Sequence, residues 1–108
     1  MSLITTHVLD TSTGTPAAGI QVILRGPEQQ HIATGKTDDD GRIGDLGPES
    51  LAPGTYELVF ATGDHFDVRG IAHFFPQVTL AFVVEASAGH YHVPLLLSPF
   101  GYTTYRGS

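Results

Sequence analysis

The stretch HYHVPLLLSP, residues 90–99, is the most informative segment for the fold of this chain. Successive side chains of an extended strand point to opposite faces, so odd- and even-numbered residues separate here. One face is apolar and consists of Tyr91, Val93, Leu95 and Leu97. The other face carries His90, His92, Leu96 and Ser98. This pattern predicts a strand with one face in a core and two histidines on the other. Pro94 lacks a backbone N–H, which favours an edge strand or a bulge.

Similar short runs recur along the chain between turn residues. With 13 Gly and 7 Pro separating β-branched and aromatic runs, the sequence is typical of a β-sandwich or barrel. The expected strands are Leu3–Asp10, Ile20–Arg25, Gln29–Lys36, Arg42–Ile43, Thr55–Thr62, Gln77–Glu85, His90–Leu97 and Tyr102–Arg106, all paired antiparallel. Asp40–Gly41 predicts a tight turn. One short helix is expected, with Asp64 as its N-cap and Gly70 as the left-handed residue that ends it.

Composition narrows the function classes. A length of 108 residues corresponds to about one domain, so we expect a single domain over residues 1–108. The absence of cysteine excludes disulfides, thiolate catalysis and Cys-ligated zinc. Five Lys/Arg against eleven Asp/Glu give a net charge of −6, which argues against a nucleic-acid partner.

No apolar run approaches the ~20 residues of a membrane span. Met1–Asp10 shows no signal-peptide pattern, so we expect a cytoplasmic protein.

Histidines and one arginine are the candidate site residues. His90 and His92 share an outer face, which indicates a binding site or an interface, the alternative being two solvated side chains. His7 lies in a β-branched strand that could pair with the strand of His92, although a lone strand histidine is commonly structural. Three histidines with an open position leave zinc as an alternative. Arg42 directly follows the expected turn, where arginines are commonly solvated.

The three remaining histidines and the end of the chain have separate interpretations. His31, His65 and His73 are interpreted as ordinary surface or helix-flanking residues. The segment 102–108, YTTYRGS, is β-prone where chains commonly fray. It predicts an ordered strand that holds the Ser108 carboxylate in place, with a flexible terminus as the alternative.

Taken together, four segments resemble a known family. They are THVLD at 6–10, DGR at 40–42, HYHVPLLLSP at 90–99 and YRGS at 105–108. In this order they are similar to the 5-hydroxyisourate hydrolases of the transthyretin-related family, over nearly the whole chain. Transthyretin itself has a similar scaffold without these histidines and this ending, so the resemblance favours an enzyme over a carrier.

The resemblance implies a transthyretin-like, all-β sandwich of two four-stranded sheets with one short helix. It implies hydrolysis of 5-hydroxyisourate to 2-oxo-4-hydroxy-4-carboxy-5-ureidoimidazoline in purine catabolism, without a cofactor or metal. It also implies a homotetramer, a dimer of dimers with sites at the dimer–dimer interface. By motif position the catalytic residues are His7, Arg42, His92 and Ser108, and the substrate-binding residues are His7, Arg42 and Tyr105. A carrier of small molecules without catalysis is the alternative.

Overall fold

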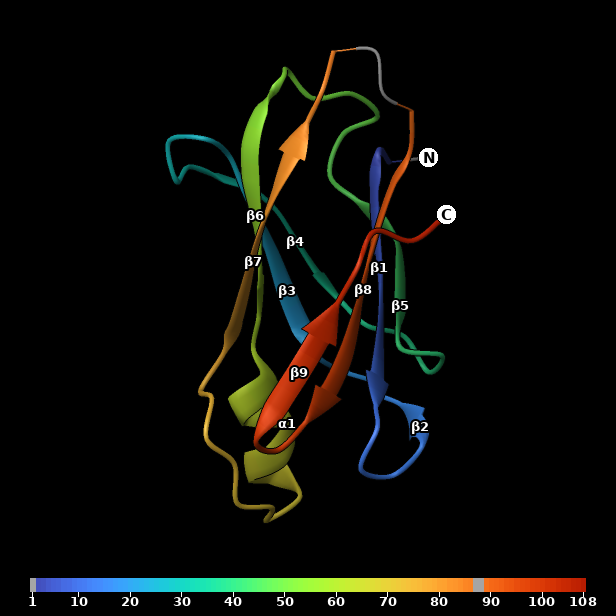
Figure 1. Cartoon of the computed structure of the whole chain (residues 1–108), viewed down its shortest axis with the longest axis vertical. Coiled ribbons are helices and arrows are strands. Elements are labelled where there is room, and N and C mark those ends of the chain that lie inside the picture. The colour runs from blue at the N-terminus through green and yellow to red at the C-terminus, as the bar shows by residue number, and fades with distance from the viewer. Residues whose placement is uncertain (1, 87–88) are drawn as a thin grey trace.

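The computed structural model describes residues 2–86 and 89–108 as two β-sheets packed face to face, with one short helix at the lower end of Figure 1. The first sheet consists of β1 (Ile4–Asp10), β2 (Thr15–Pro16), β5 (Arg42–Leu46), β8 (Tyr91–Ser98) and β9 (Gly101–Thr104). The second consists of β3 (Gln21–Arg25), β4 (His31–Lys36), β6 (Gly54–Phe60) and β7 (Val78–Val84). The helix is α1 (Thr62–Val68). The predicted sandwich is confirmed, and the two-residue β2 adds a fifth strand to the first sheet.

The order of strands places β1 and β8 in the middle of the first sheet. The order is β2-β1-β8-β9, with β5 pairing the same edge of β1 as β2, and the second sheet runs β4-β3-β6-β7. Alternate residues of these strands fill the space between the sheets. The core includes the predicted inward faces: Ile20, Val22, Leu24, Tyr56, Leu58, Phe60, Tyr91, Val93, Leu95 and Leu97.

The expectation of purely antiparallel pairing is wrong for the two central strands. β1 and β8 run parallel, in continuous register from Ile4 opposite Tyr91 to Asp10 opposite Leu97. The chain passes through the second sheet between them and returns beside β1 in the same direction, as parallel pairing requires a long connection. Local alternation carries no information about direction, so only the three-dimensional path shows it.

Pro94 does not lie on an edge strand, because β8 has a neighbour on each side. The ladder between β8 and β9 ends with Leu95 opposite Thr104 and resumes, in the same register, at a single bridge of His92 with Gly107. Pro94 lies in the gap, where its missing N–H costs no ladder bond. Its carbonyl oxygen accepts a hydrogen bond from the Thr104 hydroxyl at 2.7 Å.

The short helix starts earlier than expected. Its N-cap position is Ala61, without a side-chain cap, and Asp64 lies in the first turn, where a carboxylate stabilises the positive end of the helix. Asp64 is therefore not the N-cap. The predicted left-handed residue is confirmed, since Gly70 has φ +66°. Among the described residues, no helix is long and apolar enough to cross a bilayer.

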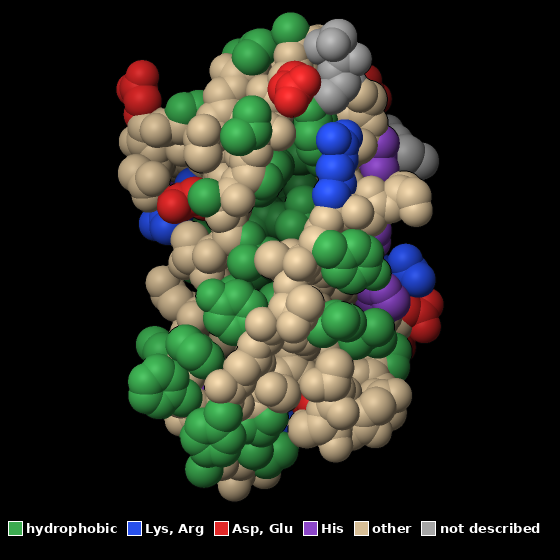
Figure 2. Space-filling view, viewed as in Figure 1, with side chains coloured by type: hydrophobic (Ala, Val, Ile, Leu, Met, Phe, Trp, Pro, Cys, Tyr) green, Lys and Arg blue, Asp and Glu red, His purple; other side chains and the backbone are tan. Residues whose placement is uncertain are grey.

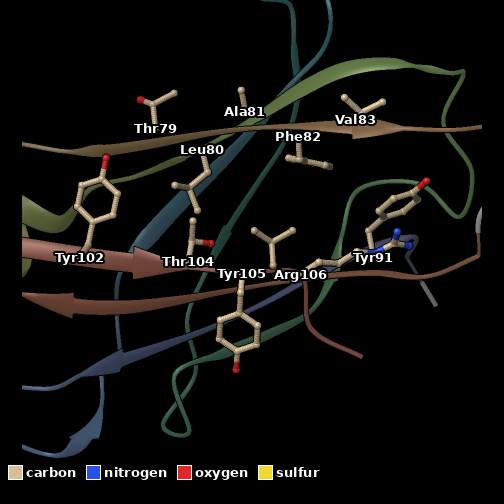
Figure 3. A pocket seen from close by; sticks show the side chains of 11 residues that line it. Thr79, Leu80, Ala81, Phe82, Val83, Tyr91, Tyr102, Thr104, Tyr105 and Arg106 are labelled. Atoms are coloured by element: carbon tan, nitrogen blue, oxygen red, sulfur yellow. The ribbon is translucent and has the colours of Figure 1, made fainter.

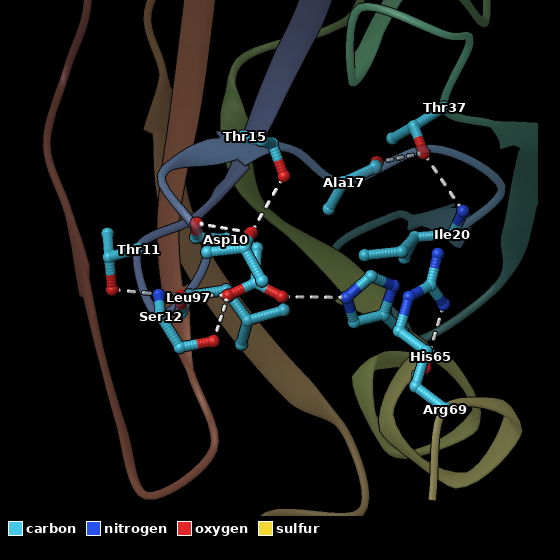
Figure 4. A network of polar contacts seen from close by, with 11 residues as sticks. Asp10, Thr11, Ser12, Thr15, Ala17, Ile20, Thr37, His65, Arg69 and Leu97 are labelled. Carbon is cyan, nitrogen blue, oxygen red and sulfur yellow. Dashed lines mark hydrogen bonds and ion pairs between the residues drawn. The ribbon is translucent and has the colours of Figure 1, made fainter. Parts of the chain in front are cut away.

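His65 is buried, which corrects its interpretation as an ordinary surface residue. Its Nε2 lies 3.1 Å from a carboxylate oxygen of Asp10, and both side chains are 3% exposed (Figure 4). The Ser12 hydroxyl and backbone N–H donate to the other oxygen of Asp10. Burial raises the pKa of Asp10, but the hydrogen bonds from Ser12 and His65 outweigh it, so the net pKa is lowered. This contact ties α1 to the end of β1.

Candidate functional site

The outer face of the first sheet brings the predicted residues into neighbouring rows. In register, His7 lies between Arg42 of β5 and Pro94 of β8. The neighbouring row places Thr5 beside His92, which in turn lies beside Gly107. Directly paired residues of a sheet project to the same side, so these side chains share one face. Figure 2 shows histidine side chains gathered along the right-hand edge of the molecule, over this sheet.

Thr5 connects the two histidines of the HYH segment. Its hydroxyl oxygen lies 2.8 Å from Nε2 of His90 and 2.8 Å from Nδ1 of His92. A hydroxyl has one hydrogen to donate, so at most one of these contacts is donated by Thr5, and the other is donated by an imidazole N–H. The protonation of the two rings is therefore linked through one oxygen.

His7 and Arg42 are positioned by the tight turn predicted at Asp40–Gly41. Gly41 has φ +75°, and a Cβ there would lie 2.3 Å from the Val8 carbonyl oxygen, so the turn requires glycine. The turn presents the Asp40 carbonyl oxygen at 2.9 Å from Nε2 of His7. A carbonyl only accepts, so Nε2 of His7 carries the hydrogen and, in the neutral ring, Nδ1 has the free lone pair.

The end of the chain is ordered against β8, as predicted, although β9 ends at Thr104. The backbone N–H of Gly107 donates to the His92 carbonyl oxygen at 2.8 Å. A Cβ on Gly107 would lie 2.5 Å from Cδ2 of His92, so only glycine allows this approach. The preceding Arg106 turns inward and its guanidinium lies 4.5 Å from the centre of the Tyr91 ring, a cation–π contact that anchors the tail.

A pocket of about 250 Å³ lies where these segments meet. Its lining comes from β1, β5, the HYH segment and the tail: Thr5, Thr6, Arg42, Ile43, Gly44, His90, His92 and Ser108. Three of the four predicted catalytic residues thus line one pocket. His7 is on the same face, in the row next to Thr5 and His92, but does not line it.

The electrostatics of the pocket favour a neutral imidazole. Burial and the positive charge of Arg42, followed by smaller contributions from His7 and His90, lower the pKa of His92 below its ordinary value of 6.5. His92 is half-buried, and its free base is the dominant form at neutral pH. A ring in this state can accept a proton from a bound water.

Tyr105 lies near a different cavity. About 480 Å³ of space opens between β7 and the segment 102–106, with Tyr105 in its lining. Its floor is the hydrophobic hollow near the centre of Figure 2. In Figure 3 the Tyr105 ring points away from β7, whereas Arg106 points toward Tyr91. By continuation of the β8–β9 register, Tyr105 falls beside Pro94, on the same face as His7.

No group of three or more His, Asp or Glu side chains within residues 2–86 and 89–108 is arranged to hold a metal ion. The imidazoles of the site make other contacts instead, His7 with a carbonyl oxygen and His90 and His92 with the hydroxyl of Thr5.

The chain was compared with known protein families, sequences and structures. The HIUase/Transthyretin family model matches residues 4–107. The chain belongs to this family. A 5-hydroxyisourate hydrolase of Caulobacter vibrioides is 46% identical over 115 residues, covering 100% of both chains. One of Salmonella typhimurium is 44% identical over 111 residues, covering 99% of this chain and 82% of the relative.

Solved structures of the family include both an enzyme and transthyretin. The 5-hydroxyisourate hydrolase of Klebsiella pneumoniae superimposes with a TM-score of 0.90 at 40% identity, covering 100% of this chain and 94% of that one. Transthyretin from Sparus aurata gives the same TM-score of 0.90 at 31% identity, covering 99% and 97%. The fold alone therefore does not separate the two. The hydrolase relatives at 44–46% identity, matched over 82–100% of their own length, do, and the predicted hydrolase is confirmed at this level.

Two contributors to the site were missed in the sequence. Thr5 is two residues before His7 and so shares its face, but nothing in the sequence indicates a contact with two histidines 85 and 87 residues away. Gly107 belongs to the quoted YRGS motif, yet its close approach to His92 depends on the strand register. The Thr5 contacts depend on the parallel pairing of β1 with β8, and the Gly107 approach depends on the antiparallel register between β8 and the end of the chain.

Proposed function

We propose that this protein hydrolyses 5-hydroxyisourate to 2-oxo-4-hydroxy-4-carboxy-5-ureidoimidazoline by attack of a histidine-activated water on a ring amide bond. The observation that carries the proposal is the convergence of Arg42, His92 and Ser108 on one pocket, with His7 in the next row of the same face. The hydrolase relatives, named for this substrate, support it.

Water is the nucleophile in this mechanism. The chain has no cysteine, so a thiolate intermediate is excluded. One of His7 and His92 takes a proton from the water as its oxygen bonds to the ring carbonyl carbon, and the other orients the water or supplies a proton. The carbon–nitrogen bond then breaks as the leaving nitrogen is protonated. The lowered pKa of His92 suits this role, since it keeps the ring unprotonated before each cycle.

Arg42 supplies the positive charge of the site. Its guanidinium is permanently protonated and presents a planar set of donors to the anionic substrate or to the oxyanion that forms on the attacked carbonyl. We assign the Ser108 carboxylate to a partner role, pairing with Arg42 or with a histidine and fixing its tautomer. Tyr105 is assigned to the substrate ring, which it would contact by stacking or by a hydrogen bond.

The outer face also supports assembly. Leu9 and Leu96 are half-buried and form a directly opposed pair on the face that carries His7 and His92. A partly apolar outer face is covered most simply by another copy of the chain. We propose a homotetramer, with the sites between its dimers. Light scattering should give about four chain masses, and a stable monomer with full activity contradicts the assembly.

Direct turnover tests the activity. 5-Hydroxyisourate is made in situ from urate by urate oxidase, and its decay is followed by ultraviolet absorbance. The wild-type protein should accelerate the decay, and Arg42→Ala should abolish the acceleration. Arg25→Ala is the matched control, because Arg25 lies on the opposite sheet in an ion pair with Glu57, and it should retain full activity.

The same assay identifies the alternative. A carrier on this scaffold would bind the substrate or a stable analogue, seen by calorimetry, without changing the rate of decay. Binding without turnover by the wild-type protein refutes the hydrolase proposal, and equal loss in Arg25→Ala and Arg42→Ala refutes the role of Arg42.

A further inference from the structure

Hydrolysis of an amide bond at neutral pH sets a proton requirement for the site. The attacking water supplies two protons; one ends on the leaving nitrogen. The other must leave the pocket, because the new carboxyl group is ionised well above its pKa of about 3–4. A site between paired copies of the chain needs a route for that proton to solvent.

The polar contacts give His92 such a route. Nε2 of His7 donates to the Asp40 carbonyl, which cannot pass a proton on. In contrast, Nδ1 of His92 contacts the Thr5 hydroxyl, and the same oxygen contacts Nε2 of His90, each at 2.8 Å. His92 is half-buried whereas His90, which lines the same pocket, is exposed, so this chain of contacts runs from the half-buried imidazole to a solvent-exposed one.

We propose that Thr5 and His90 form a proton relay that connects His92 to solvent, in which the single hydroxyl of Thr5 couples the tautomers of the two imidazoles. Thr5 is a positioning residue in this scheme and His92 is the general base. The inference rests on the function proposed above and assigns a role to Thr5 and His90.

Each proton in the relay is accounted for. In the resting site, His92 carries its hydrogen on Nδ1 and donates it to Thr5, and Thr5 donates its own to Nε2 of His90. When Nε2 of His92 takes a proton from water, its Nδ1–H breaks as an O–H forms on Thr5. The original O–H of Thr5 breaks as an N–H forms on Nε2 of His90. One proton has moved from water to His90, and His92 is neutral in its other tautomer, with its hydrogen on Nε2.

Electrostatics favour this direction. The charged and titratable groups that act on His92 are Arg42 on β5, His7 on β1 and the neighbouring His90, and Ser108 of the C-terminal segment lines the same pocket. Burial disfavours a positive charge on His92, and the positive charge of Arg42 adds to this effect. Transfer to the exposed His90 places the charge in water, from which its proton exchanges with solvent.

Two variants at one position separate the hydroxyl from packing. Thr5→Val keeps the β-branched shape and removes the hydroxyl, and it should lower kcat about 10- to 100-fold with KM within about twofold. Thr5→Ser keeps the hydroxyl and should restore kcat to within about fivefold of wild type. Thr34→Val is the matched control: Thr34 also contacts a histidine, Nε2 of His31 at 2.6 Å, but on the exposed side of β4. It should have no effect.

Two further readouts distinguish a relay from a structural contact. In mixtures of H₂O and D₂O, a plot of the wild-type kcat against the fraction of deuterium should be curved, because several protons move in one step. The same plot for Thr5→Val should be a straight line. The double variant with Thr5→Val and His90→Ala should have a kcat no lower than that of the slower single variant, because both substitutions interrupt the same proton route. Independently of substrate, ¹⁵N NMR of the resting wild-type protein should show His92 protonated at Nδ1.

The outcomes are separable from those of the proposed function. If the wild type does not accelerate decay of 5-hydroxyisourate, the proposed function fails. If it does, the relay is overturned by any one of three results: Thr5→Val within twofold of wild type in kcat, additive losses in the double variant, or His92 protonated at Nε2 alone. Should Thr5→Val not fold, His90→Ala and the NMR tautomer still decide between relay and no relay.

Discussion

The two ends of β1 each hold a histidine contact, and the contacts differ in the oxygen that makes them. At one end the neutral hydroxyl of Thr5 lies between His90 and His92 on the outer face. At the other end the Asp10 carboxylate contacts the buried His65. Alternation along one strand separates them, since Thr5 points outward and Asp10 inward.

The difference lies in what each oxygen can do with a proton. A carboxylate only accepts, so Asp10 fixes a hydrogen on Nε2 of His65 and holds α1 against β1. A hydroxyl donates and accepts, so Thr5 leaves the protons of its two histidines exchangeable. We therefore expect losses of activity at the Thr5 end and losses of stability at the Asp10 end. The following changes test that division, from the largest effect to the smallest.

Removal of a catalytic imidazole should have the largest effect. His92→Ala and His7→Ala should each lower kcat about 10²- to 10⁴-fold, the range expected for a general base. The free energy of unfolding should change by less than about 1 kcal/mol, because both rings lie on the outer face. Steady-state decay assays and urea denaturation measure the two quantities. Near-wild-type activity in either variant contradicts its assignment.

Removal of Asp10 should reverse this pattern. Asp10→Ala leaves His65 buried without its partner and should lower the free energy of unfolding by about 3–5 kcal/mol. Activity per folded molecule should be unchanged. Urea denaturation measures the loss, and the exposed Asp45→Ala is the control, with an expected change within about 0.5 kcal/mol. A loss as small as that of the control would show that the pair contributes little.

Acid should weaken the same contact. The pKa of Asp10 is lower in the folded protein than in the unfolded chain. The unfolded state therefore binds the proton first, so the stabilisation is present above the unfolded value of 3.8 and is lost as pH falls through the folded value. The free energy of unfolding, measured from pH 6 downward, should fall more steeply for the wild type than for Asp10→Asn. Parallel curves contradict the lowered pKa.

The smallest expected effect is on the titration of His92. Burial and then Arg42 lower its pKa, so Arg42→Gln should raise it by part of that shift while burial keeps it below 6.5. An NMR titration of the His92 ring reports the change directly. Arg25→Gln, on the opposite sheet where Arg25 pairs with Glu57, is the matched control and should leave the pKa of His92 unchanged. An unchanged pKa of His92 in Arg42→Gln would show that Arg42 does not act on it.

The fold could be predicted to a large extent from local patterns. Alternation placed Tyr91 inward and His92 outward, and the Asp40–Gly41 pair placed the turn, because both depend only on near neighbours in the sequence. The direction of β8 relative to β1 could not be predicted, since alternation is the same in parallel and antiparallel strands. The missing N–H of Pro94 predicts an edge strand or a bulge, and the gap in the β8–β9 ladder that accommodates it depends on strand register rather than on local sequence.

The candidate site could be predicted in part for the same reason. The resemblance of short motifs indicated His7, Arg42, His92, Tyr105 and Ser108, and the structure brings three of them to one pocket with His7 beside it. The contact of Thr5 with two histidines required the register between strands. Burial of His65 was missed because its partner lies 55 residues away in the sequence.

The parallel pairing of β1 and β8 has a consequence for how activity arises in time. Thr5 and His92 are separated by 87 residues, so their contact closes a loop that contains every strand of the second sheet. Closing such a long loop is among the slow events of folding. Turnover regained after dilution from denaturant should therefore lag behind the recovery of β-structure, and enzymatic activity serves as a readout of the last step in maturation.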